Sequence, residues 1–333
     1  MKIVYFEPHA AFRYPLHSDT LWGILCWGIR TVFDEKTLTD FLAQYDTPAG
    51  GLKISSCYPY RVTDSGKVPY FPKPFGKAGN LMGNMDDKPL SEKTSAYAGI
   101  KKFKKVSLLP EEFFFRYISG QESESSIFAD PEKLLKDTPS IKSREMHHNS
   151  INRLTGSTAD EGGNFFTQNM NYTEGAGLYC LMDGTPDQIA KAEAAFRFLS
   201  HFGLAGDAST GQNHFRITIT DYTPRIPANA NAFMTMSLYV PSPDELDHYL
   251  KDDTHLYYEL VHRKGKKGGR FTQYTHFWSE SVFAFAEGSV FPALKKPQLG
   301  CLVDAPTEDP NPDYTPKRSG IAFAIPVFLG GEQ

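Results

Sequence analysis

The chain has 333 residues, 40% of them hydrophobic, and a formal net charge of −4 at pH 7. This length exceeds what a single hydrophobic core usually organises, so we expect two domains. The composition is that of a folded protein, and no run of about 18 apolar residues predicts a membrane span. A free-standing nucleic-acid binder is more often basic, so any polyanion would have to be bound by local patches or within a complex.

The cysteines and the first residues bear on the compartment. Cys26, Cys57, Cys180 and Cys301 are far apart in sequence and include no C-x-x-C pair. Zinc sites and disulfide frameworks need clustered or paired thiols, so we expect buried, reduced cysteines and neither a metal nor a cofactor. Residues 1–6 are typical of a strand and not of a signal peptide, which favours a cytoplasmic protein with no membrane partner.

The first half of the chain alternates between strand-like and helix-like segments. A strand over residues 2–7 is followed by a helix that begins at Ser18 or Asp19, and large apolar residues on several faces predict that this helix is buried. Prolines within the aromatic segment over 68–75 argue against a central strand or a helix there. An amphipathic segment over 36–45 and a strand over 52–57 lie between them.

The second half begins with a strand over residues 177–182 and a helix whose Thr185 and Gln188 fit a capping box. Strands are expected near 215–220, 232–240 and 255–262, with a short helix over 243–250 and then a basic, glycine-rich turn from Lys264 to Arg270. This order fits the β-α-β-β-α-β pattern of a ferredoxin-like module. The first half fits the same pattern more loosely.

A glycine-rich loop, Gly203 to His214, joins that helix to the next strand. Its glycines tolerate positive φ and let backbone N–H groups approach an anion. It is not a nucleotide-triphosphate loop, because Gln212 and Asn213 stand where a Walker A motif needs Lys and Ser or Thr, and no G-x-G-x-x-G is present. Two interpretations stay open: a helix C-cap followed by a tight turn, and a cradle for RNA phosphates.

The helix start at His17 allows two interpretations as well. His17 either precedes an ordinary N-cap or helps the helix N-terminus to bind a phosphate, and Asp19 would then be structural. His147, His148 and Arg153 suggest a nuclease in which a histidine acts as general base and the arginine stabilises developing charge.

The alternative for that segment is simple contact of His148, Asn152 and Arg153 with phosphates or bases. Most aromatic residues of the first 71 positions are expected in the core or at a subunit interface, although Tyr58, Tyr60, Tyr70 and Phe71 could instead stack on bases. The aromatic residues in question are Trp22, Trp27, Tyr58, Tyr60, Tyr70 and Phe71.

Four signals occur in order along the chain: the helix start His17-Ser18-Asp19-Thr20-Leu21-Trp22-Gly23, the Pro-Lys-Pro at 72–74, the segment Ile151-Asn152-Arg153-Leu154-Thr155-Gly156, and the glycine loop. Together they resemble the RAMP-superfamily subunit that caps the crRNA 5′ handle in type III-A CRISPR (Csm) effector complexes, the fourth subunit of the Csm operon. The resemblance runs from the first strand to Gly320-Ile321-Ala322-Phe323.

This resemblance implies an α+β fold of two ferredoxin-like (RRM-related) RAMP modules with insertions, which we place at 1–143 and 144–333. The second module would carry the glycine loop and a thumb-like hairpin, matched to Thr155–Asn164, although the segment 76–95 competes for that role. The implied function is that of a non-catalytic RNA-binding and assembly subunit. The alternative is a metal-independent RAMP endoribonuclease that processes crRNA, and a purely structural scaffold is a third hypothesis.

The implied partners are the crRNA 5′ handle, the large HD/polymerase-domain subunit, the backbone RAMP subunits, and target RNA near its pairing with the guide 5′ end. The loop departs from the family, because Ala208 and Gln212 stand where basic residues are usual. Each missing cationic contact lowers the slope of log affinity against log salt by roughly 0.7 on single strands. The expected RNA-binding residues are His17, Ser18, Lys73, His148, Asn152, Arg153, Gly203, Gly206, Asp207, Ser209, Thr210, Gly211, His214 and Arg216.

Overall fold

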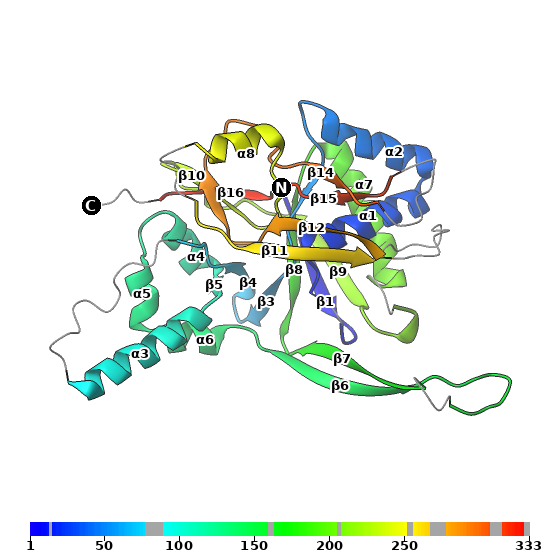
Figure 1. The fold of residues 1–333 in the computed structure, drawn as a ribbon, viewed down its shortest axis with the longest axis horizontal. Coiled ribbons are helices and arrows are strands. Elements are labelled where there is room, and N and C mark those ends of the chain that lie inside the picture. The colour runs from blue at the N-terminus through cyan, green and yellow to red at the C-terminus, as the bar shows by residue number, and fades with distance from the viewer. Residues whose placement is uncertain are drawn as a thin grey trace.

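The structure is a computed structural model that describes residues 1–12, 15–76, 89–158, 163–204, 208–251, 256–266, 278–306 and 315–329. It is a mixed α+β fold built on antiparallel sheets (Figure 1). Within these ranges no helix combines the length and apolar character needed to cross a bilayer.

A central antiparallel sheet holds the fold together. Its strands follow the order β5-β4-β3-β8-β1-β9, and a short strand, β2, also pairs with β8. Strand β1 lies between β8 and β9, so that Val4 pairs with Cys180 on one side and with Ile219 on the other. The strands are β1 (Lys2–Pro8), β2 (Lys53–Ile54), β3 (Tyr58–Thr63), β4 (Gly66–Pro72), β5 (Leu108–Pro110), β8 (Ala176–Asp183) and β9 (Phe215–Asp221).

The ferredoxin-like pattern is found in this sheet, but its elements come from both halves of the chain. Strand β1, helix α1 (Ser18–Val32), β3, β8, helix α7 (Pro186–Phe202) and β9 form the β-α-β-β-α-β unit, with strand order β3-β8-β1-β9. The division that we expected between residues 143 and 144 therefore does not separate two sheets, and the glycine loop belongs to this first unit. The strand patterns were visible in sequence, but alternation alone does not identify which strand pairs with which.

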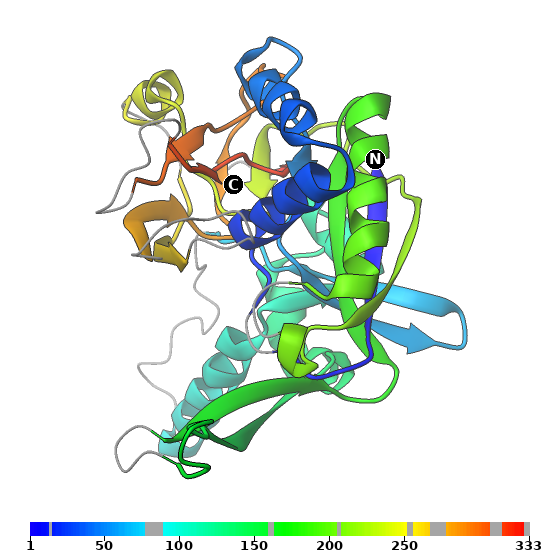
Figure 2. The same ribbon diagram turned by 90° about the vertical axis from the view of Figure 1, so that its right-hand side faces the viewer.

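The segment between β5 and β8 is a large insertion. Its helices are α3 (Leu90–Lys105), α4 (Glu111–Ile118), α5 (Glu124–Ala129) and α6 (Pro131–Asp137). They are followed by a long hairpin of β6 (Ile141–Asn149) and β7 (Asn164–Tyr172), which extends away from the body in both views (Figures 1 and 2). This hairpin contains the described part of the range expected for the thumb. Of the competing segment 76–95, residues 77–88 lie outside the described residues and residues 90–95 form the first part of helix α3.

The C-terminal unit follows β9 and covers the second face of the central sheet. A three-stranded sheet of order β13-β10-β16 forms its centre, and β11–β12 and β14–β15 are separate hairpins. Its elements are β10 (Ala232–Thr235), α8 (Pro243–Tyr249), β11 (Leu260–Lys266), β12 (Trp278–Phe285), β13 (Val290–Pro292), β14 (Leu302–Asp304), β15 (Lys317–Ser319) and β16 (Ala324–Val327).

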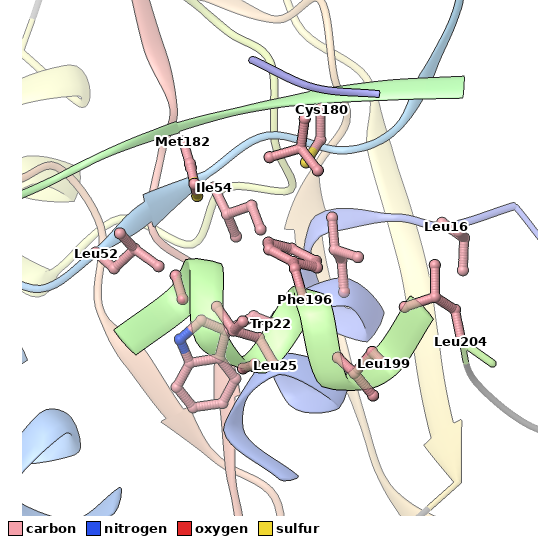
Figure 3. Close-up of a cluster of buried hydrophobic side chains, with 14 of the residues drawn as sticks. Leu16, Trp22, Leu25, Leu52, Ile54, Cys180, Met182, Phe196, Leu199 and Leu204 are labelled. Carbon is pink, nitrogen blue, oxygen red and sulfur yellow. The ribbon is translucent and has the colours of Figure 1, made fainter. Parts of the chain in front are cut away.

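Both faces of the central sheet are buried, which explains the nearly continuous apolar run of β1. Val4 and Phe6 face the core beneath α1, α7 and α2 (Glu35–Ala43), whereas Ile3 belongs to the core shared with the C-terminal unit. Figure 3 shows side chains of the first core, among them Trp22 of α1 and Phe196 of α7. Helices α1 and α7 approach closely at Gly28, where an added Cβ would lie 3.0 Å from the Cβ of Ala195.

Two expectations about single residue types can be compared with the structure. The four cysteines are unpaired, and Cys26 and Cys180 are buried. The expectation that prolines exclude a central strand over 68–75 was wrong, because β4 pairs with both β3 and β5. Strand β3 pairs with Gly66–Pro69 and β5 pairs with Tyr70–Pro72, so each proline of β4 is paired on one side.

Candidate nucleic-acid interface

The glycine loop closes helix α7 and is tied to the end of β1. Gly203 has φ +85° and donates its N–H to the Leu199 carbonyl over 2.8 Å, so the loop begins as a helix C-cap. Leu204 N–H donates to the Asn213 carbonyl over 2.9 Å, and Asn213 N–H donates to the Ala11 carbonyl over 2.9 Å. The turn is thus anchored at both ends. Gly206 and Asp207 lie outside the described residues.

The second part of the loop is a single 3₁₀ turn over Ala208–Thr210, which places the backbone of Ser209 and an exposed Thr210. Gly211 follows with φ +84°, and a Cβ added to it would meet no atom of the described residues within 4 Å. His214 Nε2 lies 3.0 Å from the Ala208 carbonyl oxygen, so this imidazole is within hydrogen-bond distance of the turn. The backbone of Gly211 therefore has open space beside it for a ligand.

Gln212 is one of two positions of this loop, with Ala208, at which the resemblance leads us to expect a basic residue. It is 7% exposed, and its Oε1 atom has no hydrogen-bond partner among the residues that the structure describes. Leaving a buried acceptor unpaired costs free energy, so such an atom is a place where a donor from a ligand would be favoured. An amide oxygen can accept from a ribose hydroxyl or a base amino group but not from a phosphate.

Arg216 is paired across the sheet with Glu7. Its Nη2 lies 2.6 Å from both carboxylate oxygens, and the two residues face each other in the β1–β9 register. Hydrogen bonding to Glu7 raises the pKa of Arg216, and the same contact lowers the pKa of Glu7. The positive charge of Arg216, one of the expected RNA-binding residues, is thus shared with a carboxylate of this chain.

The start of helix α1 is covered by the C-terminal unit. His17 Nδ1 lies 2.7 Å from Glu287 Oε1, and Ser56 Oγ donates to the same oxygen over 2.5 Å. Ser18 is 2% exposed: its N–H donates to Ser56 Oγ, and its own hydroxyl accepts from Leu238 N–H over 2.9 Å. A carboxylate of the chain itself therefore stands where we expected an RNA phosphate.

Asp19 is structural, as expected. Its Oδ1 accepts from Thr20 N–H over 2.6 Å and from Arg263 Nη2 over 3.0 Å. Arg263 is on β11, so this ion pair is a second link between α1 and the C-terminal unit. The start of helix α1 therefore connects the unit built on the central sheet to the C-terminal unit, and we call this set of contacts the joint.

Lys73 also has partners within the protein. Its Nζ lies 4.1 Å from the centre of the Phe103 ring and 3.7 Å from Glu124 Oε1. Burial lowers the pKa of Lys73, while the carboxylate of Glu124 opposes that shift. In this arrangement the lysine connects β4 to the insertion helices.

The β6–β7 hairpin presents the remaining candidates. His148 pairs with Phe165 and His147 with Phe166, and in each pair the rings are stacked, with centroids 5.1 Å and 4.3 Å apart. Successive residues of a strand point to opposite faces, so the two histidines lie on opposite sides of the hairpin. They therefore cannot act together on one reacting atom.

One face of the hairpin is basic. The register places Lys142, Arg144 and His148 on the same face as Phe165, and Phe165 is 46% exposed. Glu145, the one acidic residue of β6 and β7, is on the opposite face. This face combines cations with an accessible ring.

The turn of the hairpin carries Asn152 and Arg153. Asn152 Oδ1 accepts from Leu154 N–H over 2.9 Å, and Gly156 N–H donates to the Asn152 carbonyl over 2.8 Å. Asn152 thus shapes the turn, Arg153 is exposed, and Leu154 is 96% exposed.

Residues 9–12 join the hairpin to the glycine loop. Phe12 N–H donates to the Met170 carbonyl of β7 over 3.0 Å, and the Phe12 ring stacks on Tyr172. On the other side His9 N–H donates to the His214 carbonyl over 2.9 Å. The structure thus brings the loop and the hairpin base together, whereas His17, Ser18 and Lys73 lie elsewhere.

Most of the aromatic residues that we expected in the core are there. Tyr58, Tyr60, Tyr70 and Phe71 are 7% exposed or less, and Trp22 donates its indole N–H to the Tyr45 hydroxyl. Among the described residues, no group of His, Cys, Asp and Glu is arranged to hold a metal ion.

Comparison with known proteins bears on this arrangement. Residues 228–327 match the family described as the CRISPR Csm4 C-terminal domain. A crystal structure of a Csm1–Csm4 cassette in complex with cA4 matches with a TM-score of 0.62 and 19% identity, covering 99% of both chains. A Csm3–Csm4 subcomplex of a type III-A interference complex matches with a TM-score of 0.62 and 14% identity, covering 99% of this chain and 100% of the other.

The resemblance to Csm4 is thereby confirmed. The matched Csm4 domain coincides with the C-terminal unit, from the segment before β10 to the end of β16. The glycine loop and the β6–β7 hairpin lie before it, so their likeness to Csm4 is one of fold. No curated protein sequence matches the chain significantly.

Proposed function

We propose that this chain is a non-catalytic RNA-binding and assembly subunit of a type III-A CRISPR interference complex. It holds the 5′ handle of crRNA and docks against the large polymerase-domain subunit and the backbone RAMP subunits. The observation that carries the proposal is the fold, which is shared over 99% of the chain with structures of Csm1–Csm4 and Csm3–Csm4 complexes.

The geometry supports a division of labour in binding RNA. The open backbone at Gly211 and the unpaired oxygen of Gln212 are suited to the sugar–phosphate chain of one RNA end. The basic face of the β6–β7 hairpin, with Phe165 and His148, is suited to an adjacent stretch of RNA, because rings can stack on bases while Lys142 and Arg144 neutralise phosphates. The segment over residues 9–12 fixes the spacing of the two sites.

Crosslinking in the assembled complex tests this proposal. The chain is co-expressed with the large and backbone subunits and a crRNA that carries 4-thiouridine at each handle position in turn. Handle positions should crosslink to this chain, and Lys142→Ala with Arg144→Ala should reduce crosslinking at the positions beside the hairpin. Lys133→Ala, an exposed lysine of α6, is the matched control. Crosslinks that reach only other subunits would refute RNA binding by this chain.

The endoribonuclease hypothesis is tested separately. That hypothesis needs one histidine as general base beside Arg153, whereas each hairpin histidine is stacked on a phenylalanine ring, so purified protein should leave repeat RNA intact. Cleavage that His148→Ala abolishes would overturn the proposal in favour of crRNA processing.

A further inference from the structure

The β11–β12 hairpin has one face that is fixed against the rest of the protein. Arg263 on this face forms the ion pair with Asp19, and Arg318 of β15 donates to the Arg263 carbonyl over 2.7 Å. Ser279 Oγ donates to the Gly265 carbonyl over 3.1 Å. The hairpin is thus held against α1 and β15.

The opposite face points outward and is unusually aromatic. Phe283 is 67% exposed and Trp278 is 45% exposed. The ring of His262 lies 5.2 Å from that of Phe283, and Lys264 Nζ lies 5.8 Å from the centre of the Trp278 ring. Leu260, at 53% exposed, extends the row. The hairpin runs across the front of the body in Figure 1 and lies on its left side in Figure 2.

The charge of this region departs from that of the whole chain. Strand β11 contains Arg263, Lys264 and Lys266 and no aspartate or glutamate, although the net charge of the chain is −4. Glu259 precedes this strand, and Glu280 is the acidic residue of β12. A stretch that is locally this basic attracts a polyanion.

The combination of rings and cations distinguishes between kinds of partner. Protein interfaces are enriched in aromatic residues but depleted in lysine, whereas single-stranded nucleic acid is bound by a positive surface with rings on which bases stack. A duplex keeps its bases stacked on each other and would not use the rings of Phe283 and Trp278.

We propose that the outward face of the β11–β12 hairpin is a second binding surface for single-stranded RNA. Bases stack on Phe283 and Trp278, and Lys264 and His262 attract the phosphates. The surface belongs to other elements than the glycine loop and the β6–β7 hairpin, and stacking makes it tolerant of sequence. The choice of RNA over DNA rests on the proposed function, but the existence of a nucleic-acid surface does not.

The test uses the purified full chain and labelled 15-nucleotide oligomers, poly-U RNA and poly-dT DNA, which carry no handle sequence. Phe283→Ala should weaken RNA binding about fivefold and Phe283→Ala with Trp278→Ala about tenfold or more, given the strength of base–aromatic stacking. Phe33→Ala, at an exposed ring just after α1, is the matched control and should stay within twofold. Lys264→Ala should lower the salt slope by roughly 0.7. Circular dichroism and thermal melting check that each variant folds.

Several outcomes would overturn the inference. Unchanged RNA binding by both ring variants, with loss only on Lys264→Ala, would mean non-specific attraction of charge. Loss of a protein subunit from the assembled complex with unchanged RNA binding would mean a protein interface, and tighter binding of poly-dT than of poly-U would assign DNA. Handle crosslinking in the complex is scored apart, so its failure would refute the proposed function and leave this surface standing.

Discussion

The start of helix α1 and the β6–β7 hairpin were both expected to bind RNA, yet their surroundings are opposite. Ser18 is 2% exposed and is bonded to Leu238, 220 residues away in sequence. Leu154 at the hairpin turn is 96% exposed, and His148 bonds across its own hairpin to Thr167. Polar residues at a helix start and at a turn look equally available in sequence. Whether such residues are buried in contacts within the protein depends on partners that are far away in the sequence.

The largest effect on stability is expected at Ser18. Ser18→Ala removes the acceptor of the buried Leu238 N–H, which should lower the free energy of unfolding by about 1–3 kcal/mol. Urea denaturation measures the change, and Ser125→Ala at an exposed serine of α5 is the control. Equal stability of the two variants would show that the helix start is not part of the joint between the units.

An intermediate effect on stability is expected in the glycine loop. Two of its glycines have nearly the same positive φ, but a side chain would meet other atoms at only one of them. Gly203→Ala places a Cβ 2.7 Å from that of Ala208 at φ +85°, whereas Gly211→Ala at φ +84° meets open space. The left-handed backbone should lower the free energy of unfolding of both variants by about 1 kcal/mol. Gly203→Ala should lose more, because its new Cβ also collides with Ala208. A larger loss at Gly211, measured by thermal unfolding, would contradict this account of the loop.

A pH effect is expected at the joint. Burial by itself would raise the pKa of Glu287, but hydrogen bonds from His17 and Ser56 and the charge of His17 lower it overall. A carboxylate with a lowered pKa stabilises the folded state above its unfolded pKa of about 4.3, and this contribution is lost as the pH falls through the folded value. Glu287→Gln should therefore flatten the loss of stability below about pH 4.3. Thermal melting at a series of pH values measures this. If the variant and the wild-type protein lose stability equally below that pH, the His17–Glu287 contact is contradicted.

The smallest effect on stability is expected at the hairpin. Lys142→Ala with Arg144→Ala changes exposed side chains, so the free energy of unfolding should shift by less than about 0.5 kcal/mol. Binding of single-stranded RNA should nevertheless weaken, with a salt slope lower by roughly 0.7 for each lost contact. A loss of stability comparable to that of Ser18→Ala would contradict the difference in burial between the β6–β7 hairpin and the start of α1.

Some features of this protein were determined by its sequence alone, because they depend on neighbours within a few residues. The capping box of Thr185 and Gln188 formed as expected, and α1 begins at Ser18. The likeness to Csm4 was also visible as an ordered set of motifs. Hydrogen bonds between residues three or four apart leave a pattern that can be read directly.

Other features were decided only by the tertiary structure. Pairing of β1 with β8 and β9 joins strands from both halves of the chain in one sheet, since alternation does not identify a strand's neighbour. Arg216 pairs with Glu7, 209 residues away in sequence, and His17 pairs with Glu287, 270 residues away. No local sequence pattern predicts such partners. The residue types that can bind RNA were thus set by the sequence, and their availability was set by contacts between distant segments.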